Sequence, residues 1–180
     1  SKDSLQVHGG PVSADRACIS GVTDLGEWFY EKDFNKDIGH WDVSSVTRMY
    51  ALFSYSSFNQ DIGKWDVSNA TNMNSLFKAA ISFNQDISSW DVSNVYDMAY
   101  MFEKARAFDQ PIGSWNVSNV TKMQGMFEDA RMFNQPIGNW DVSKVRNMTN
   151  MFKRTTFNQP IGDWNTGSVT TMYQMFFENQ

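Results

Sequence analysis

A tryptophan that returns at an almost constant interval constrains this chain more than any other feature. The intervals between six tryptophans are 24, 25, 25, 25 and 24 residues. A similar sequence motif surrounds each tryptophan and is clearest at residues 133–143, which read FNQPIGNWDVS. Self-similarity with a period of roughly 20–50 residues is the signature of repeat architectures, in which each unit packs against its neighbours. We therefore predict six stacked units. Their tryptophans are Trp41, Trp65, Trp90, Trp115, Trp140 and Trp164.

The spacing inside each unit is fixed. The first Phe precedes Trp by seven residues, as in Phe133 and Trp140, and Trp precedes Met148 by eight. The second Phe, here Phe152, follows that Met by four residues. All variation in length falls between the second Phe and the next unit's first Phe, so we predict that this segment is the loop.

An apolar stripe follows each tryptophan at helical spacing. Val46, Met49, Leu52 and Phe53 stand at i, i+3, i+6 and i+7, which places them on one face of an α-helix. Ser44 precedes the stripe and can accept a hydrogen bond from an early helical N–H, as an N-cap does. The pattern predicts a helix of roughly ten residues in each unit.

Upstream of the predicted helix, Trp65, Asp66 and Val67 alternate apolar, polar and apolar, which is typical of a short strand. One unit buries too little apolar surface to offset the entropy of ordering its backbone, whereas stacked units share their core. Parallel crossovers are right-handed. The predicted fold class is therefore α/β, a right-handed leucine-rich-repeat-like solenoid of about six strand-helix coils with short parallel strands.

The domain organisation follows from where the repeat begins. Val22, Leu25, Trp28 and Phe29 reproduce the helical stripe without a preceding strand motif. We predict an N-terminal cap and half-coil over residues 1–33 and a six-repeat solenoid over 34–180. The repeats start near residues 34, 58, 83, 108, 133 and 157.

Composition argues against several functions. The chain has 15 Lys+Arg, 20 Asp+Glu and a net charge of −5, without a basic cluster, so we expect no nucleic-acid partner. Its apolar runs are far too short for a transmembrane segment. The single Cys18 allows no internal disulfide and no cysteine-based zinc site. His8 and His40 are the only histidines, and no catalytic motif stands out, so we expect no enzyme and no cofactor.

The wording of residues 58–69, FNQDIGKWDVSN, continued by Thr71, Met73, Leu76 and Phe77, resembles the repeat of BspA-like leucine-rich-repeat surface proteins. Mycoplasma and Listeria surface lipoproteins typify that family. The likeness covers about residues 22–176. It implies a leucine-rich-repeat-like solenoid on the extracellular surface of a cell, with adhesion as its role and no catalytic residues.

Stacking would turn each repeated position into a column, and the clearest polar column directly follows the tryptophans. Like charges about 4.8 Å apart repel, so consecutive aspartates need a cation, a partner or backbone donors. One interpretation is a ligand-binding surface, with Ca²⁺ as a candidate along Asp42, Asp66, Asp91 and Asp141. The other is that each side chain makes an Asx-type turn bond. The predicted binding column is Asp42, Asp66, Asp91, Asn116, Asp141 and Asn165.

Three further columns are predicted to be structural. The tryptophans are more consistent with packing than with an exposed platform for sugar rings, and the methionines fill the helical stripe. The residues after the first Phe are expected to turn inward and hydrogen-bond loop backbone. These residues are Asn35, Asn59, Asn84, Asp109, Asn134 and Asn158.

The sequence favours a non-catalytic module that presents a repeat scaffold to a protein or glycan partner. The alternative is a structural spacer or a self-associating surface-layer tile that joins end to end. Specificity would reside at positions that differ between copies, including the loops at residues 78–82, 103–107 and 128–132. On the predicted helix these positions are Arg48, Asn72, Asp97, Lys122, Asn147 and Thr171.

Overall fold

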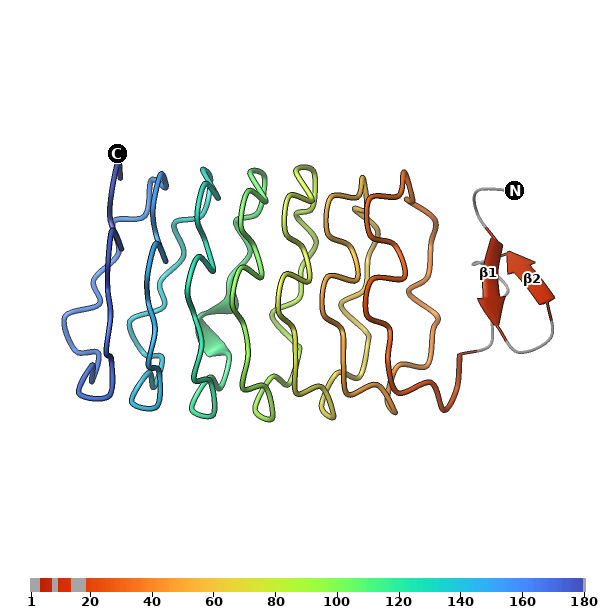
Figure 1. Cartoon of the computed structure of the whole chain (residues 1–180), viewed down its shortest axis with the longest axis horizontal. Helices are drawn as coiled ribbons and strands as arrows, with labels where there is room; N and C mark the ends of the chain where they lie inside the picture. Colours follow the sequence, from red (N-terminus) through yellow and green to blue (C-terminus); the bar gives the residue numbers. More distant parts are fainter. Residues whose placement is uncertain (1–3, 8–9, 14–18, 180) are drawn as a thin grey trace.

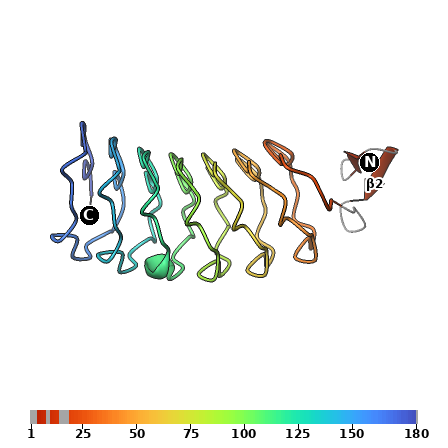
Figure 2. The ribbon, with the colours of Figure 1, turned by 90° about the horizontal axis from the view of Figure 1, so that it is seen from below.

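The computed structural model describes residues 4–7, 10–13 and 19–179. From residue 19 onward the chain winds through coils that follow one another in sequence order along the long axis (Figure 1). Seen from below, the same coils lie side by side as narrow loops (Figure 2). A series of isolated parallel bridges joins each coil to the next at one position. The bridged residues are Asp24, Arg48, Asn72, Asp97, Lys122, Asn147 and Thr171.

Regular secondary structure is sparse in the described part of the chain. Strand β1 (Ser4–Val7) pairs antiparallel with strand β2 (Gly10–Ser13), and Ser4 lies opposite Ser13. A single 3-10 turn, η2, spans Ile112–Ser114. Among residues 4–7, 10–13 and 19–179 no other helix or strand is formed. The predicted α/β fold of strand-helix coils is therefore wrong.

In the segment predicted to be helical, the backbone N–H groups alternate between two kinds of acceptor: carbonyls of the next coil and carbonyls of the same segment. The N–H groups of Met49, Ala51, Phe53 and Tyr55 donate to carbonyls of the following coil at 2.7–2.9 Å. The N–H groups between them close local turns, as where Leu52 donates to the carbonyl of Met49 at 3.3 Å. In an α-helix every such N–H would bond four residues back and none could reach a neighbouring coil. Inter-coil bonding has thus replaced the helix.

Left-handed residues interrupt each of these segments at the same two positions. Ala51 has φ of 51° and Tyr55 has φ of 57°. Gly125, at the position of Ala51, has φ of 60°. Such residues cannot continue a right-handed helix. The apolar spacing of three and four residues fits both a helix and these overlapping turns, so the spacing alone does not distinguish the two.

The predicted strand is also absent, although its alternation is correct. Trp65 and Val67 are buried and Asp66 is exposed. The parallel bridges run through the segment that was expected to be helical, and not through this one. Ser44 and its equivalents therefore cap no helix. The backbone N–H of Ser44 donates to the carboxylate of Asp42 at 3.1 Å.

Aromatic rings form the core as continuous stacks along the coils. Phe53 and Phe77 have ring centroids 5.7 Å apart, and the second stack places Phe58 6.4 Å from Phe83. Within one coil the rings of Phe53 and Phe58 lie 3.9 Å apart. Since both phenylalanine positions are repeated in register, each ring packs against partners within its own coil and in adjacent coils.

The tryptophans complete this core and tie the coils together. Trp115 is 4% exposed, and its Nε1–H donates to the carbonyl of Ile87 in the preceding coil at 3.2 Å. Trp65 makes the equivalent bond to Ile38 at 3.1 Å. A buried indole N–H needs an acceptor, and stacking supplies one.

The predicted division at residue 33 stays a prediction. The apolar stripe of the proposed half-coil does enter the core, since Leu25 and Phe29 are buried and Val22 and Trp28 pack against them. Cys18 and His8 lie outside the described residues.

Candidate functional site

The polar column predicted to bind a ligand faces solvent, and each member closes a local turn. Carboxylate Oδ1 of Asp66 accepts the backbone N–H of Ser68 at 3.1 Å and its hydroxyl at 2.6 Å. Asn116 accepts the N–H of Ser118 at 3.2 Å, so an amide performs the same role. This is the Asx-type turn bond that the sequence offered as the alternative to ligand binding. The exposed residues are Asp42, Asp66, Asp91, Asn116, Asp141 and Asn165.

These turn bonds also stabilise the charges. The hydroxyl of Ser68, followed by its backbone N–H, lowers the pKa of Asp66 below its usual value. The neighbouring carboxylates Asp42 and Asp91 raise the pKa of Asp66, but by less. The pKa of Asp141 is lowered by Ser143 in the same way. Local donors therefore outweigh the repulsion expected along the column.

Binding of Ca²⁺ along Asp42, Asp66, Asp91 and Asp141 stays a prediction, as does the binding role of the whole column. In the part of the chain that the structure describes, no three His, Cys, Asp or Glu side chains gather closely enough to hold a metal ion. Each carboxylate of the column is already engaged by the serine two residues on, at Asp42, Asp66, Asp91 and Asp141.

The column after the first Phe is structural, as predicted, but it does not turn into the core. The side-chain oxygen of Asn59 accepts the backbone N–H of Asn84 in the next coil at 3.0 Å. The same oxygen accepts Nε2 of Gln85 at 2.9 Å. Asn84 is exposed, so this ladder stabilises the stack at its surface. Asp109 accepts the N–H of Asn134 in the same manner at 3.0 Å.

The tryptophan and methionine columns pack as predicted. Trp41 to Trp164 are at most 8% exposed, so their rings offer no platform for a sugar. The methionines of the stripe, such as Met49 and Met123, are fully buried. Met172 is an exception because it lies in the last described coil and is 41% exposed.

Positions proposed to carry specificity take part in contacts between coils. Arg48 pairs with Asp24 of the preceding coil at 3.4 Å. Lys122 pairs at 2.9 Å with Asp97, which is 4% exposed. In these pairs side chains that differ between copies are matched across the bridge, so part of the variation reflects coil pairing.

The bridges define a face of the coils that no sequence motif marks. We call the segments that carry them the ladder segments: residues 22–33, 46–57, 70–82, 95–107, 120–132, 145–156 and 169–179. All six tyrosines of the chain fall in these segments, whereas the repeated tryptophans lie outside them. Tyr55 is 46% and Tyr96 44% exposed. Aligning the repeats would have shown this placement, because the tyrosines replace small or polar residues of other copies.

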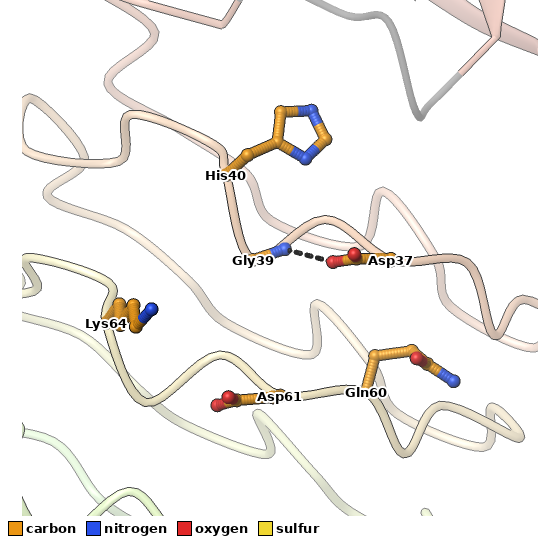
Figure 3. Close-up of a pocket in the computed structure, with 6 residues that line it drawn as sticks. All are labelled: Asp37, Gly39, His40, Gln60, Asp61 and Lys64. Carbon is orange, nitrogen blue, oxygen red and sulfur yellow. Dashed lines mark hydrogen bonds between the residues drawn. The ribbon is translucent and has the colours of Figure 1, made fainter.

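Several shallow hollows lie on the surface of the coils. The first, of about 370 Å³, is lined by residues of two neighbouring coils (Figure 3). One hydrogen bond is drawn among them, from the N–H of Gly39 to Asp37 at 2.9 Å. The second hollow, of about 390 Å³, lies on the ladder segments and is lined by Thr121, Lys122, Gln124, Arg146 and Asn147. Both are open depressions. The first is lined by Asp37, Gly39, His40, Gln60, Asp61 and Lys64.

Repeated coils joined by backbone hydrogen bonds, with stacked aromatic rings inside, define a tandem-repeat protein. The sequence matches the family model described as "Mycoplasma protein of unknown function, DUF285" twice, over residues 15–111 and 86–180. The chain belongs to this family. No curated protein and no solved structure matches it. In the described residues, no helix combines the length and the apolar character needed to cross a membrane.

Proposed function

We propose that this chain is a non-catalytic recognition or adhesion module on the extracellular surface of a cell, where its repeats are presented to a protein or glycan partner. The observation that supports this function is the contrast between the interior and the ladder segments. Phe and Trp repeat unchanged inside, while exposed tyrosines and charged residues vary outside. Tyrosine offers large, rigid contact area at low entropic cost.

The absence of catalysis is part of the same proposal. Each coil repeats the same polar groups in the same turns, as the serine and aspartate pairs illustrate. Catalysis needs an asymmetric set of acid, base and nucleophile within reach of one substrate. The resemblance to BspA-like surface proteins supports the proposed location on the cell surface. It does not extend to the strand-helix coils of a leucine-rich-repeat fold, which this chain lacks in its described residues.

The test is binding of labelled protein to cultured cells, extracellular-matrix proteins and a glycan array. We expect saturable binding that falls when Tyr55 and Tyr96 are both changed to Ser. The matched control changes Lys64 and Asn139, which are exposed outside the ladder segments, to Ala and should bind like wild type. No saturable binding on any surface would contradict the proposal.

A structural spacer or self-associating tile is the second candidate, because each coil already packs against equivalent coils through repeated backbone bridges and a shared core. Contacts of this kind can also join separate copies of a chain. Sedimentation velocity over a hundredfold concentration range would show concentration-dependent oligomers if this is correct.

A further inference from the structure

Taken together, the middle coils carry different charge on their two sides. The five ladder segments between residues 46 and 156 contain nine Lys or Arg and four Asp or Glu. The six intervening segments, 34–45, 58–69, 83–94, 108–119, 133–144 and 157–168, contain three Lys or Arg and nine Asp or Glu. The first and last ladder segments, 22–33 and 169–179, contain one Lys and five Asp or Glu, so the excess of basic residues is confined to the ladder segments of residues 46–156.

Burial strengthens the basic character of the ladder segments. Asp97, Glu103 and Asp129 are 4–7% exposed, while the side chains of Lys122 and Lys104 are nearly half exposed. The acids thus lie beneath their cationic partners. An approaching molecule meets the cations first, together with exposed tyrosines.

The basic and aromatic groups converge at one column. Tyr96, Thr121 and Arg146 occupy equivalent positions in consecutive coils. The Thr121 N–H donates to the Tyr96 carbonyl at 3.0 Å, and the Arg146 N–H donates to the Thr121 carbonyl at 2.9 Å. Lys122 Nζ lies 5.8 Å from the centre of the Tyr96 ring and is held by Asp97. Backbone pairing fixes the spacing of these groups, which preorganises the surface.

The second hollow lies beside this column and offers both donors and an acceptor. Lys122 and Arg146 supply cationic donors, and Thr121 and Asn147 add a hydroxyl and an amide. Gln124 lines the same hollow, and its side-chain Oε1 is buried without a hydrogen-bond partner. The Gln124 oxygen thus has no hydrogen bond to lose when the side chain turns towards a ligand that donates one.

A ligand for this surface needs three properties: negative charge for Lys122 and Arg146, hydroxyl donors for Gln124, and a flat apolar face for the Tyr96 ring. Acidic sugars combine all three. Building on the recognition function above, we propose that the Tyr96–Thr121–Arg146 column and its hollow bind an acidic polysaccharide through carboxylate or sulfate groups. A linear polymer also suits the face, because Lys78 over Tyr100 at 5.1 Å and Arg48 over Tyr50 at 5.3 Å repeat the pairing of cation and ring.

The test measures the binding of the complete chain to defined polymers by biolayer interferometry. Hyaluronan carries carboxylates only and dextran sulfate carries sulfates only, so the two identify the anionic group. Dextran is the neutral control, and polyglutamate is an acidic chain without sugar rings. Binding is expected to hyaluronan, dextran sulfate or both, weakening as salt rises from about 50 to 300 mM. Dextran and polyglutamate should bind at least about tenfold more weakly.

Variants locate the site. Arg146→Gln and Tyr96→Ala should each weaken binding by about five- to tenfold, as expected for losing a charged hydrogen bond or a ring contact. Both side chains are exposed, and thermal melts will verify that each variant is folded. Lys64→Gln removes the same charge from the opposite face and should change binding by less than about twofold.

Three results would overturn the assignment: no binding to either acidic polymer at low salt, equal binding to polyglutamate, or an effect of Lys64→Gln as large as that of Arg146→Gln. Equal binding to polyglutamate would point to an acidic protein. Cell or matrix binding that persists in Arg146→Gln and Tyr96→Ala would leave the recognition function standing while refuting this site.

Discussion

Removing the indole of Trp115 tests whether the tryptophan column holds the stack together. The residue lies in a middle coil and is 4% exposed. Its ring centroid is 6.4 Å from that of Phe102, and its Nε1–H donates to Ile87 of the preceding coil. Trp115→Ala therefore opens a cavity and leaves the carbonyl of Ile87 without its indole donor.

Large-to-small aromatic substitutions in cores cost about 3–5 kcal/mol, and the loss of one hydrogen bond costs about 0.5–1.5 kcal/mol. The Ile87 carbonyl still accepts the backbone N–H of Trp90 at 3.1 Å, so cavity formation dominates the cost of Trp115→Ala. Trp115→Phe keeps an aromatic ring but loses the donor and part of the ring volume, so it should cost about 1–3 kcal/mol. The difference between the two variants separates ring packing from the inter-coil hydrogen bond.

The assay is urea unfolding, followed by tryptophan fluorescence and circular dichroism on each variant. Trp164→Ala is the matched control because Trp164 makes the same bond, to Ile137 at 3.2 Å. Trp164 lies near the end of the stack and is 8% exposed, so its loss should cost clearly less. A loss below about 1 kcal/mol for Trp115→Ala, or an equal loss at Trp164, would refute the reasoning.

Three further predictions concern the turns. Gly125→Ala should destabilise the chain by about 1–2 kcal/mol in urea unfolding, since Gly125 has φ of 60° and a Cβ would meet the Tyr100 ring at 2.5 Å; an unchanged midpoint would contradict this. Hydrogen bonds from Ser68 lower the pKa of Asp66 in the folded state. The ionised Asp66 therefore stabilises the fold at pH values above its unfolded-state pKa, near 3.8, and this contribution is lost as the pH falls below that value. Ser68→Ala should therefore flatten the fall of the melting temperature between about pH 5 and 2, and an identical fall would argue against the bond. Asp91→Asn should lower the melting temperature only slightly, and equally with and without Ca²⁺, because Asn116 makes the same turn without a charge; a Ca²⁺-dependent rise that this change abolishes would instead support the calcium ladder.

The tyrosine and charge pattern illustrates why the candidate site escaped sequence analysis. Tyr96, Lys122 and Gln124 differ in type and come from two copies, so no motif joins them. Their proximity follows from parallel pairing of residues about 25 positions apart, as in the bridge between Asp97 and Lys122. Without that register, Lys122 appears as a solvated charge. The Asp column was easier to predict because each turn is local, from Asp66 to Ser68.

The sequence by itself determined the repeat, the apolar positions of the core and the alternation around each tryptophan. Burial of Trp65, Met73 and Phe77 follows directly from their fixed spacing. Only the tertiary structure decided the local conformation, because spacing of three and four residues suits a helix and overlapping turns equally. A helix and overlapping turns differ in the carbonyl to which each backbone N–H donates. For Met73 that acceptor is the carbonyl of Asp97 in the next coil, at 3.0 Å, and it exists only once the coils have stacked.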